Sequence, residues 1–365
     1  MQSQSRTMGL PWALAAADGD RRPFARLVIA VLIVALGCSA MLSMAWGASD
    51  ASVFAVLLDW LPGAADGALS DRDRIIIYDI RLPRTVMGIM IGASLAVAGA
   101  VLQGLFRNPL ADPGIIGVSA GAALGAVSVI VLGGTVLAPV TYSLGIFALP
   151  VAAFAGGLAA TLLLYRVATR QGRTSVATML LAGIALGALA AAFTGLLVFV
   201  SDDRQLRDLT FWSLGSLAGA TWTKIGAAGP IIAAALAAAP FLARGLNGFA
   251  LGEATANHLG IPVQRFKYVA ILAATAATGA SVAVSGGIAF VGIVVPHLLR
   301  LLIGPDHRYL LPASAMLGAI MLLLADAVSR TIVAPAELPI GIVTAAVGAP
   351  FFLWILLRKR GVLDL

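Results

Sequence analysis

Long apolar stretches separated by short polar segments dominate the pattern of this chain. A helix needs about 20 mostly apolar residues to cross the hydrocarbon core of a bilayer. Stretches of that size, with ends that hold to within a few residues, run over 26–46, 84–105, 114–133, 144–167, 175–200, 222–243, 266–284, 286–303, 309–328 and 338–357. The pattern therefore predicts about ten transmembrane helices. The eighth stretch is the least regular, because Gly286, Gly287, Gly292 and Pro296 interrupt it.

Composition strengthens this prediction. Hydrophobic residues make up 60% of the chain and charged residues 11%, whereas soluble domains carry about 25% charged residues. The 40 glycines suit helices that pack closely through small residues in lipid. We predict an all-α integral membrane protein with one transmembrane domain over 26–357, a cytoplasmic N-terminal extension over 1–25 and a cytoplasmic tail over 358–365. A soluble globular fold is excluded.

The formal charge of +7 is interpreted first as a signal of membrane orientation and not of nucleic-acid binding. The reason is that Lys and Arg gather in the cytoplasmic loops of membrane proteins. With ten spans, sixteen of the 24 basic residues fall on the side of the termini and eight on the other. Both termini are therefore predicted in the cytoplasm, and no nucleic acid partner is expected. Alternatively, Arg21 to Cys38 is a cleaved secretory signal. The apolar run continues to Trp46, which is longer than the roughly 7–15 residues of a signal, and favours an uncleaved first helix.

A repeated segment relates two of the predicted spans. Gly-Ala-Ser-Leu-Ala-Val-Ala-Gly at 92–99 recurs as Gly-Ala-Ser-Val-Ala-Val-Ser-Gly at 279–286, and Pro109 and Pro296 follow at identical spacing. The copies lie in the second and seventh spans and so cross the membrane in opposite directions. Inverted repeats with helices interrupted by Gly and Pro are typical of transporters. The alternative is chance recurrence in a bundle rich in small residues.

Three polar segments interrupt the apolar pattern. Arg81 and Arg84 flank a Leu-Pro pair at the outer mouth of the second span, where they could bind carboxylates of a partner or simply lie at the lipid interface. Residues 107–114 form a tight turn or line an opening between the second and third spans. Residues 251–262 are too polar to span, and predict short cytoplasmic helices bounded by glycines that insert into a partner's groove.

These segments resemble the FecCD family of permeases from residue 75 to 357. The motifs that carry the resemblance are Arg81-Leu82-Pro83-Arg84, Gln103-Gly104, Arg107 to Pro113, Gly117 to Gly121, Phe211 to Ser216, Leu251-Gly252-Glu253, Phe290 to His297, Asp306-His307-Arg308, Ala325-Asp326 and Glu337 to Gly341. The resemblance implies the fold of a type II ABC importer permease in the inner membrane. It also implies the partners: a second permease copy in a homodimer, two cytoplasmic ATPase subunits and a periplasmic binding protein.

The resemblance further implies roles for individual residues. Arg81, Arg84 and Arg330 are expected to dock acidic residues of the binding protein. The cytoplasmic gate is expected at Asn108, Leu110, Thr174 and Ser175. A coupling segment over 246–263 is expected to seat on the ATPase through Leu251, Gly252, Glu253, Ala256, Leu259 and Gly260.

The chain itself carries no phosphate-binding loop, since its lysines are Lys224, Lys267 and Lys359 and none follows the glycine-rich pattern of that loop. We therefore expect no catalytic residues and no cofactor on this chain, with ATP and Mg²⁺ bound by the partner ATPase. An intramembrane enzyme would need converging polar residues within the spans. Asp326, the chief acid there, has no evident partner in the sequence.

The cargo is the least determined part of the prediction. Resemblance to haem permeases over Asn108–Ala123 and Gly304–Pro312 favours haem, and a ferric siderophore or cobalamin is the alternative. His258, His297 and His307 invite interpretation as haem ligands, but all three lie in or near general family motifs, so structural roles are favoured and no metal site is predicted. A passive channel is the alternative of a different class.

Overall fold

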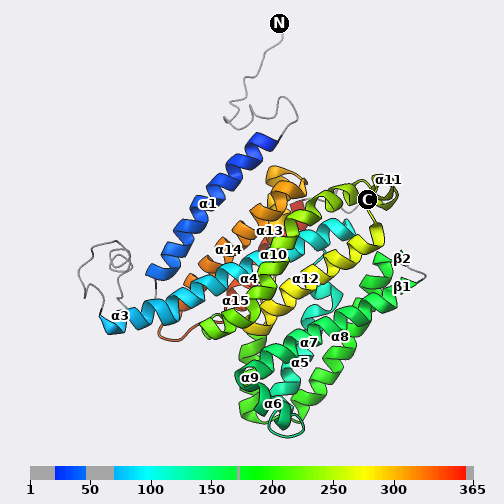
Figure 1. Ribbon diagram of the computed structural model, residues 1–365. Helices are drawn as coiled ribbons and strands as arrows, with labels where there is room; N and C mark the ends of the chain where they lie inside the picture. The colour runs from blue at the N-terminus through cyan, green and yellow to red at the C-terminus, as the bar shows by residue number, and fades with distance from the viewer. Residues whose placement is uncertain (1–20, 47–69, 171–172, 359–365) are drawn as a thin grey trace.

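The computed structural model describes residues 21–46, 70–170 and 173–358 (Figure 1). Most of the predicted N-terminal extension and of the tail lies outside these residues. The prediction of an all-α bundle with about ten membrane helices is confirmed. Within the described residues, seven helices are long and apolar enough to cross a bilayer, and Val118–Leu132, Val291–Ile303 and Ile340–Trp354 are shorter apolar helices.

Each predicted span corresponds to one helix. The ten are α1 (Arg22–Ala45), α4 (Leu82–Phe106), α5 (Val118–Leu132), α7 (Ala148–Ala168), α8 (Val176–Phe199), α10 (Trp222–Ala250), α12 (Val263–Ser285), α13 (Val291–Ile303), α14 (His307–Thr331) and α15 (Ile340–Arg358). Shorter elements connect them: α3 (Asp71–Ile75), the π-helix η2 (Ile76–Arg81), the 3-10 helices η3 (Pro113–Ile116) and η4 (Gly145–Phe147), α6 (Ala138–Leu144), α9 (Asp203–Leu214), α11 (Glu253–His258) and the antiparallel hairpin of β1 (Thr169–Arg170) and β2 (Arg173–Thr174).

The structure differs from the predicted boundaries in three places. The second helix starts at Asp71 rather than near 84, because Ser70 caps it through the Asp73 amide at 3.1 Å and α3, η2 and α4 run on without a break. Helix α10 continues to Ala250, past the predicted end at 243. Helix α13 begins only at Val291, because Gly286 and Phe290 adopt positive φ angles of 73° and 69° that interrupt a helix.

Helix α4 is the central element of the bundle. It packs against α1, α10, α12, α13 and α14, and most of its length is buried. Two of its glycines allow the closest approaches: Gly92 lies against the backbone of Gly318 in α14, and Gly99 lies against that of Gly292 in α13. A second group of α5, α7 and α8 packs beside it, and α5 and α7 approach through Gly121 and Gly156. The small residues therefore act as helix contacts, as the composition predicted.

The predicted inverted repeat places equivalent residues in contact. Ser94 of α4 and Ser281 of α12 hold the same position in the two copies, 187 residues apart, and their hydroxyls lie 2.5 Å from each other. The helices run in opposite directions through the bundle. Equivalent positions of the two copies therefore meet at one contact between α4 and α12.

The bundle has two ends that carry different polar residues. The Arg84 end holds the C-terminus of α1, the starts of α4, α10 and α15 and the C-terminus of α14. The α11 end holds α11, the β1–β2 hairpin, the start of α12 and the start of α14. Figure 1 shows α11 and the hairpin together at one end and α3 at the opposite end.

Candidate functional site

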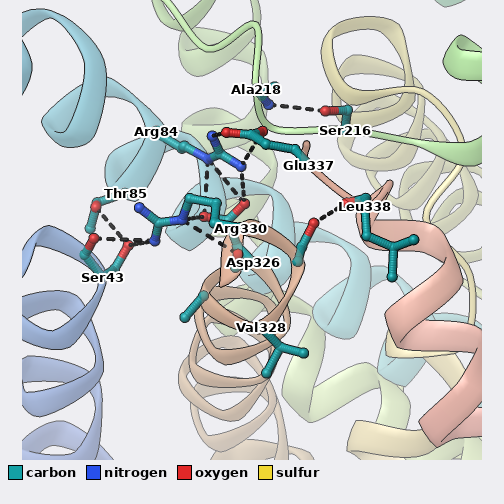
Figure 2. A network of polar contacts seen from close by, with 12 residues as sticks. Ser43, Arg84, Thr85, Ser216, Ala218, Asp326, Val328, Arg330, Glu337 and Leu338 are labelled. Carbon is teal, nitrogen blue, oxygen red and sulfur yellow. Dashed lines mark hydrogen bonds and ion pairs between the residues drawn. The ribbon is translucent and has the colours of Figure 1, made fainter. Parts of the chain in front are cut away.

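A cluster of buried charges occupies the Arg84 end (Figure 2). Arg84, in the first turn of α4, donates from Nε to Asp326 Oδ1 at 3.0 Å and from Nη2 to the same oxygen at 2.9 Å. The other side of the guanidinium meets Glu337, with Nη1 to Oε1 at 2.9 Å and Nη2 to Oε2 at 3.0 Å. The side chains of Arg84 and Asp326 are 6% and 1% exposed, whereas that of Glu337 is 40% exposed. Arg84 and Asp326 are therefore shielded from solvent, and Glu337 is the member of this group that solvent reaches.

Arg330 completes this cluster from the last turn of α14. Its Nε lies 3.1 Å from Asp326 Oδ2. Its Nη2 donates to the carbonyl and the hydroxyl of Ser43 in α1, both at 3.2 Å, and the Ser43 hydroxyl lies 2.9 Å from that of Thr85. Asp326 thus joins two arginines from two helices, and these are the partners that were not evident from the sequence. Arg84 lies 242 positions away in sequence, whereas Arg330 lies four residues further along α14, a spacing that brings opposite charges together on a helix.

Arg81 lies at the same end but contacts a different helix. Its Nη1 donates to the carbonyl of Met44 at 2.7 Å, and the residue is 4% exposed. All three predicted docking arginines are thus brought together at one end, as expected. All three are also buried and bonded within the chain, which the sequence did not indicate.

The predicted gate residues fall into two separate turns. Asn108 and Leu110 follow α4, where the Asn108 side chain accepts a hydrogen bond from the Leu110 amide at 2.9 Å. In the same loop, Asp112 accepts one from Gly114 at 2.7 Å. Burial raises the pKa of the Asp112 carboxyl, against the opposing effect of the Gly114 hydrogen bond. This loop is therefore tied by its own side chains.

Thr174 and Ser175 end the β1–β2 hairpin and start α8. Thr174 is buried, and its amide and hydroxyl both donate to Gln264 Oε1 at 3.2 Å. The exposed Ser175 caps α8 by accepting from the Thr178 amide at 3.3 Å. The sequence correctly placed these residues at the start of a span but gave no sign of the hairpin.

The predicted coupling residues surround one short helix. Gly252 and Gly260 flank α11 with φ angles of 106° and 78°, a conformation that favours glycine. Ala256 is fully buried, whereas Leu251 and Leu259 are 67% and 57% exposed. Glu253 at the start of α11 pairs with Lys267 at 2.6 Å. The segment therefore exposes two leucines on either side of a short helix that Ala256 anchors to the bundle.

The three histidines lie apart and do not form one site. Among the described residues, no three His, Cys, Asp or Glu side chains gather closely enough to hold a metal ion. His307 Nδ1 lies 2.9 Å from Asn247 Oδ1, and His258 is exposed on α11. Another polar link that the sequence did not indicate joins Gln103 in α4 to Arg300 in α13 at 3.0 Å.

Three relatives of this chain are all named as permease proteins of transport or import systems. The hemin transport system permease protein HmuU of Yersinia pestis is 46% identical over 285 residues, covering 78% of this chain and 84% of that protein. The cobalamin import system permease protein BtuC of Halobacterium salinarum is 46% identical, covering 79% and 75%. A vitamin B12 import system permease protein BtuC of Salmonella paratyphi A is 43% identical, covering 80% and 86%.

A solved structure has the same arrangement of helices over most of the chain. It is described as a metal-chelate type ABC transporter in an inward-facing conformation, and it matches with a TM-score of 0.79 and 30% identity over 91% of this chain and 99% of that chain. A description of the FecCD transport family fits residues 31–358. This match spans nine tenths of the chain and agrees with both the relatives and the structure. The chain is therefore a multi-pass membrane protein that belongs to the FecCD transport family.

Proposed function

We propose that this chain is the permease subunit of an ATP-driven importer that moves haem across the inner membrane. The observation that carries this proposal is the 46% identity to a hemin permease over 84% of that protein's length. Cobalamin is the second candidate cargo, because a cobalamin permease is 46% identical over a similar share of the chain. A ferric siderophore is the third.

The proposal includes the partners and the orientation. Two copies of the chain form a homodimer, two cytoplasmic ATPase subunits bind at the α11 end, and a periplasmic binding protein delivers cargo at the Arg84 end. Both termini then lie in the cytoplasm. The exposed Leu251 and Leu259, which flank α11, support an ATPase contact there, because exposed apolar side chains beside a short helix suit a partner's groove. ATP and Mg²⁺ bind to the ATPase, and this chain holds no cofactor.

Docking of the binding protein is proposed at Arg81, Arg84 and Arg330. Arg84 and Arg330 are already paired with carboxylates of this chain, and Arg81 is bonded to the Met44 carbonyl, so an acidic partner must replace one of these internal contacts. Glu337 suits this exchange, since it is the exposed partner of Arg84. Asp326 remains buried between Arg84 and Arg330 and keeps them in place.

Access to the pathway is proposed to alternate at the gate residues Asn108, Leu110, Thr174 and Ser175 as the ATPases close. The pathway must bind a whole chelate weakly, and the helices rich in small residues suit this requirement. A passive channel remains the alternative of a different class. It would continue to work when the α11 contact is removed.

The cargo is tested with the complete importer in vesicles. The binding protein is loaded in turn with haem, a ferric siderophore and cobalamin, and the ATPase rate is measured for each. Haem is expected to give the largest stimulation. Stimulation by cobalamin alone would contradict the haem assignment and leave the permease assignment intact.

A further inference from the structure

A buried lysine at the start of α12 joins two segments that the proposed function treats separately. Lys267 is 2% exposed. Its Nζ lies 2.6 Å from Glu253 Oε1 at the start of α11 and donates to the backbone carbonyl of Thr174 in β2 at 3.0 Å. One ammonium group therefore contacts both α11 and the β1–β2 hairpin.

The hairpin is held to α12 by a second residue of the same turn. Gln264 Oε1 accepts from the amide and the hydroxyl of Thr174. The Thr174 hydroxyl also lies 2.9 Å from that of Thr169 across the hairpin. Ser175 follows directly, donates its amide to Ala168 at 3.1 Å and caps α8. Thr174 is therefore bonded directly to the residue that caps α8.

The buried charge of Lys267 favours the contact between α11 and the hairpin. An ammonium group buried without its counter-charge is strongly unfavourable, so Lys267 favours positions that keep both Glu253 and the Thr174 carbonyl within reach. Glu253 is 46% exposed and lies beside the exposed Leu251. A partner that shifts α11 acts directly on this ion pair.

We propose that Lys267 is a positioning residue that couples movement of α11 to the β1–β2 hairpin and to the start of α8. The proposal rests on the proposed function, since it takes α11 as the ATPase contact and Thr174 as part of the gate. It adds a specific route between them, from Glu253 through Lys267 to Thr174. The Glu253 carboxylate and the Thr174 carbonyl are both acceptors, and Lys267 is the donor that links them.

The test uses the complete importer in vesicles and compares Lys267→Met with Arg265→Met. Arg265 lies two residues away on the same helix and is exposed, so its variant is the matched control. The amount of ATPase that copurifies, the rate of ATP hydrolysis and the cargo moved per ATP are all measured. Lys267→Met is expected to assemble and hydrolyse ATP but to move about tenfold less cargo per ATP, a size typical of coupling between sites. Arg265→Met is expected to behave as the wild type.

A second variant keeps the test decisive if Lys267→Met folds poorly. Glu253→Gln removes the same ion pair from an exposed position and is expected to give the same loss of cargo per ATP. The double variant is expected to lose no more than the larger single loss, because both changes break one contact. Additive losses, or reduced assembly with unchanged cargo per ATP, would overturn the coupling role. Absence of ATP-dependent uptake by the wild-type complex would instead contradict the proposed function.

Discussion

Single residues at the Arg84 end show how charge is accommodated in an apolar bundle. Ionisable groups inside a membrane protein are unfavourable unless they are paired. Asp326 meets this condition through Arg84 and Arg330, and Glu337 balances the second positive charge. The sequence singled out the arginines as residues that bind a partner or lie at the lipid interface, and not as partners of acids within the chain. It could not predict the pairing of Arg84 with Asp326, because the two residues are 242 positions apart, whereas the pair of Asp326 and Arg330 has the i,i+4 spacing of helix neighbours.

Replacing Asp326 tests the structural part of this cluster. Asp326→Asn leaves two buried guanidiniums without their shared carboxylate, and removing one partner of a buried ion pair typically destabilises a protein by about 3–5 kcal/mol. We expect a clearly lower unfolding temperature in detergent micelles. Asp208→Asn, which changes an exposed acid on α9, is the control. Equal unfolding temperatures for the two variants would contradict the account.

Glu337 tests the docking part of the cluster separately. Glu337→Gln removes an exposed negative charge beside Arg84 while Asp326 still holds the guanidinium. An acidic binding protein should then associate severalfold faster, since charges at the rim of an interface act mainly on the association rate. Surface plasmon resonance at two salt concentrations measures this effect. A slower association would indicate that Glu337 itself helps to bind the partner.

At the scale of helices, the apolar pattern and the structure agree on number and order and disagree at the ends. Hydropathy reports where the chain is apolar, but caps and backbone angles decide where a helix stops. Ser70 extends the second helix into a polar segment, and Phe290 delays α13 through a positive φ angle. The hairpin at Thr174 is too short for any periodicity to reveal it. The repeated segment could be recognised in the sequence because its two copies share small residues, among them Ser94 and Ser281, which meet at the contact between α4 and α12.

The contact between α4 and α13 yields a prediction about glycine. A Cβ added at Gly99 would overlap the carbonyl oxygen of Gly292, whereas one added at Gly37 in α1 would meet nothing within 4 Å. Gly99→Ala is therefore expected to destabilise the protein by about 1–3 kcal/mol, the usual range for overpacking. Gly37→Ala is expected to leave stability unchanged or slightly higher, because Ala favours helix. Unfolding by a denaturing detergent compares the two, and equal stability would argue against this close approach.

Helix α11 yields a prediction about assembly. Changing both Leu251 and Leu259 to Ser removes the exposed apolar side chains proposed to seat on the ATPase, without touching the buried Ala256. Copurification of the ATPase with the permease is expected to fall sharply. The control changes Val136 and Ile146 to Ser, which are 76% and 69% exposed and lie between α5 and α7. A channel without an ATPase partner would respond to neither pair.

For the whole molecule, composition and motifs were enough to predict a helical membrane bundle of the right family. The position of the three arginines at one end and of α11 at the other was also predictable, because each follows from counting membrane crossings. The contacts between the polar segments became visible only in the structure. The ion pair of Glu253 with Lys267 and the shared hydrogen bonds of Thr174 join residues that the sequence had assigned to different roles.

The central claim is that this chain provides a route and docking surfaces while a partner supplies the energy. The most direct measurement is cargo accumulation against a gradient in vesicles that contain the purified chain, with ATP and the loaded binding protein, with and without the ATPase subunits. We expect accumulation only when catalytically active ATPase is present. Accumulation driven by nucleotide with this chain alone, or sustained by a catalytically inactive ATPase, would contradict the account.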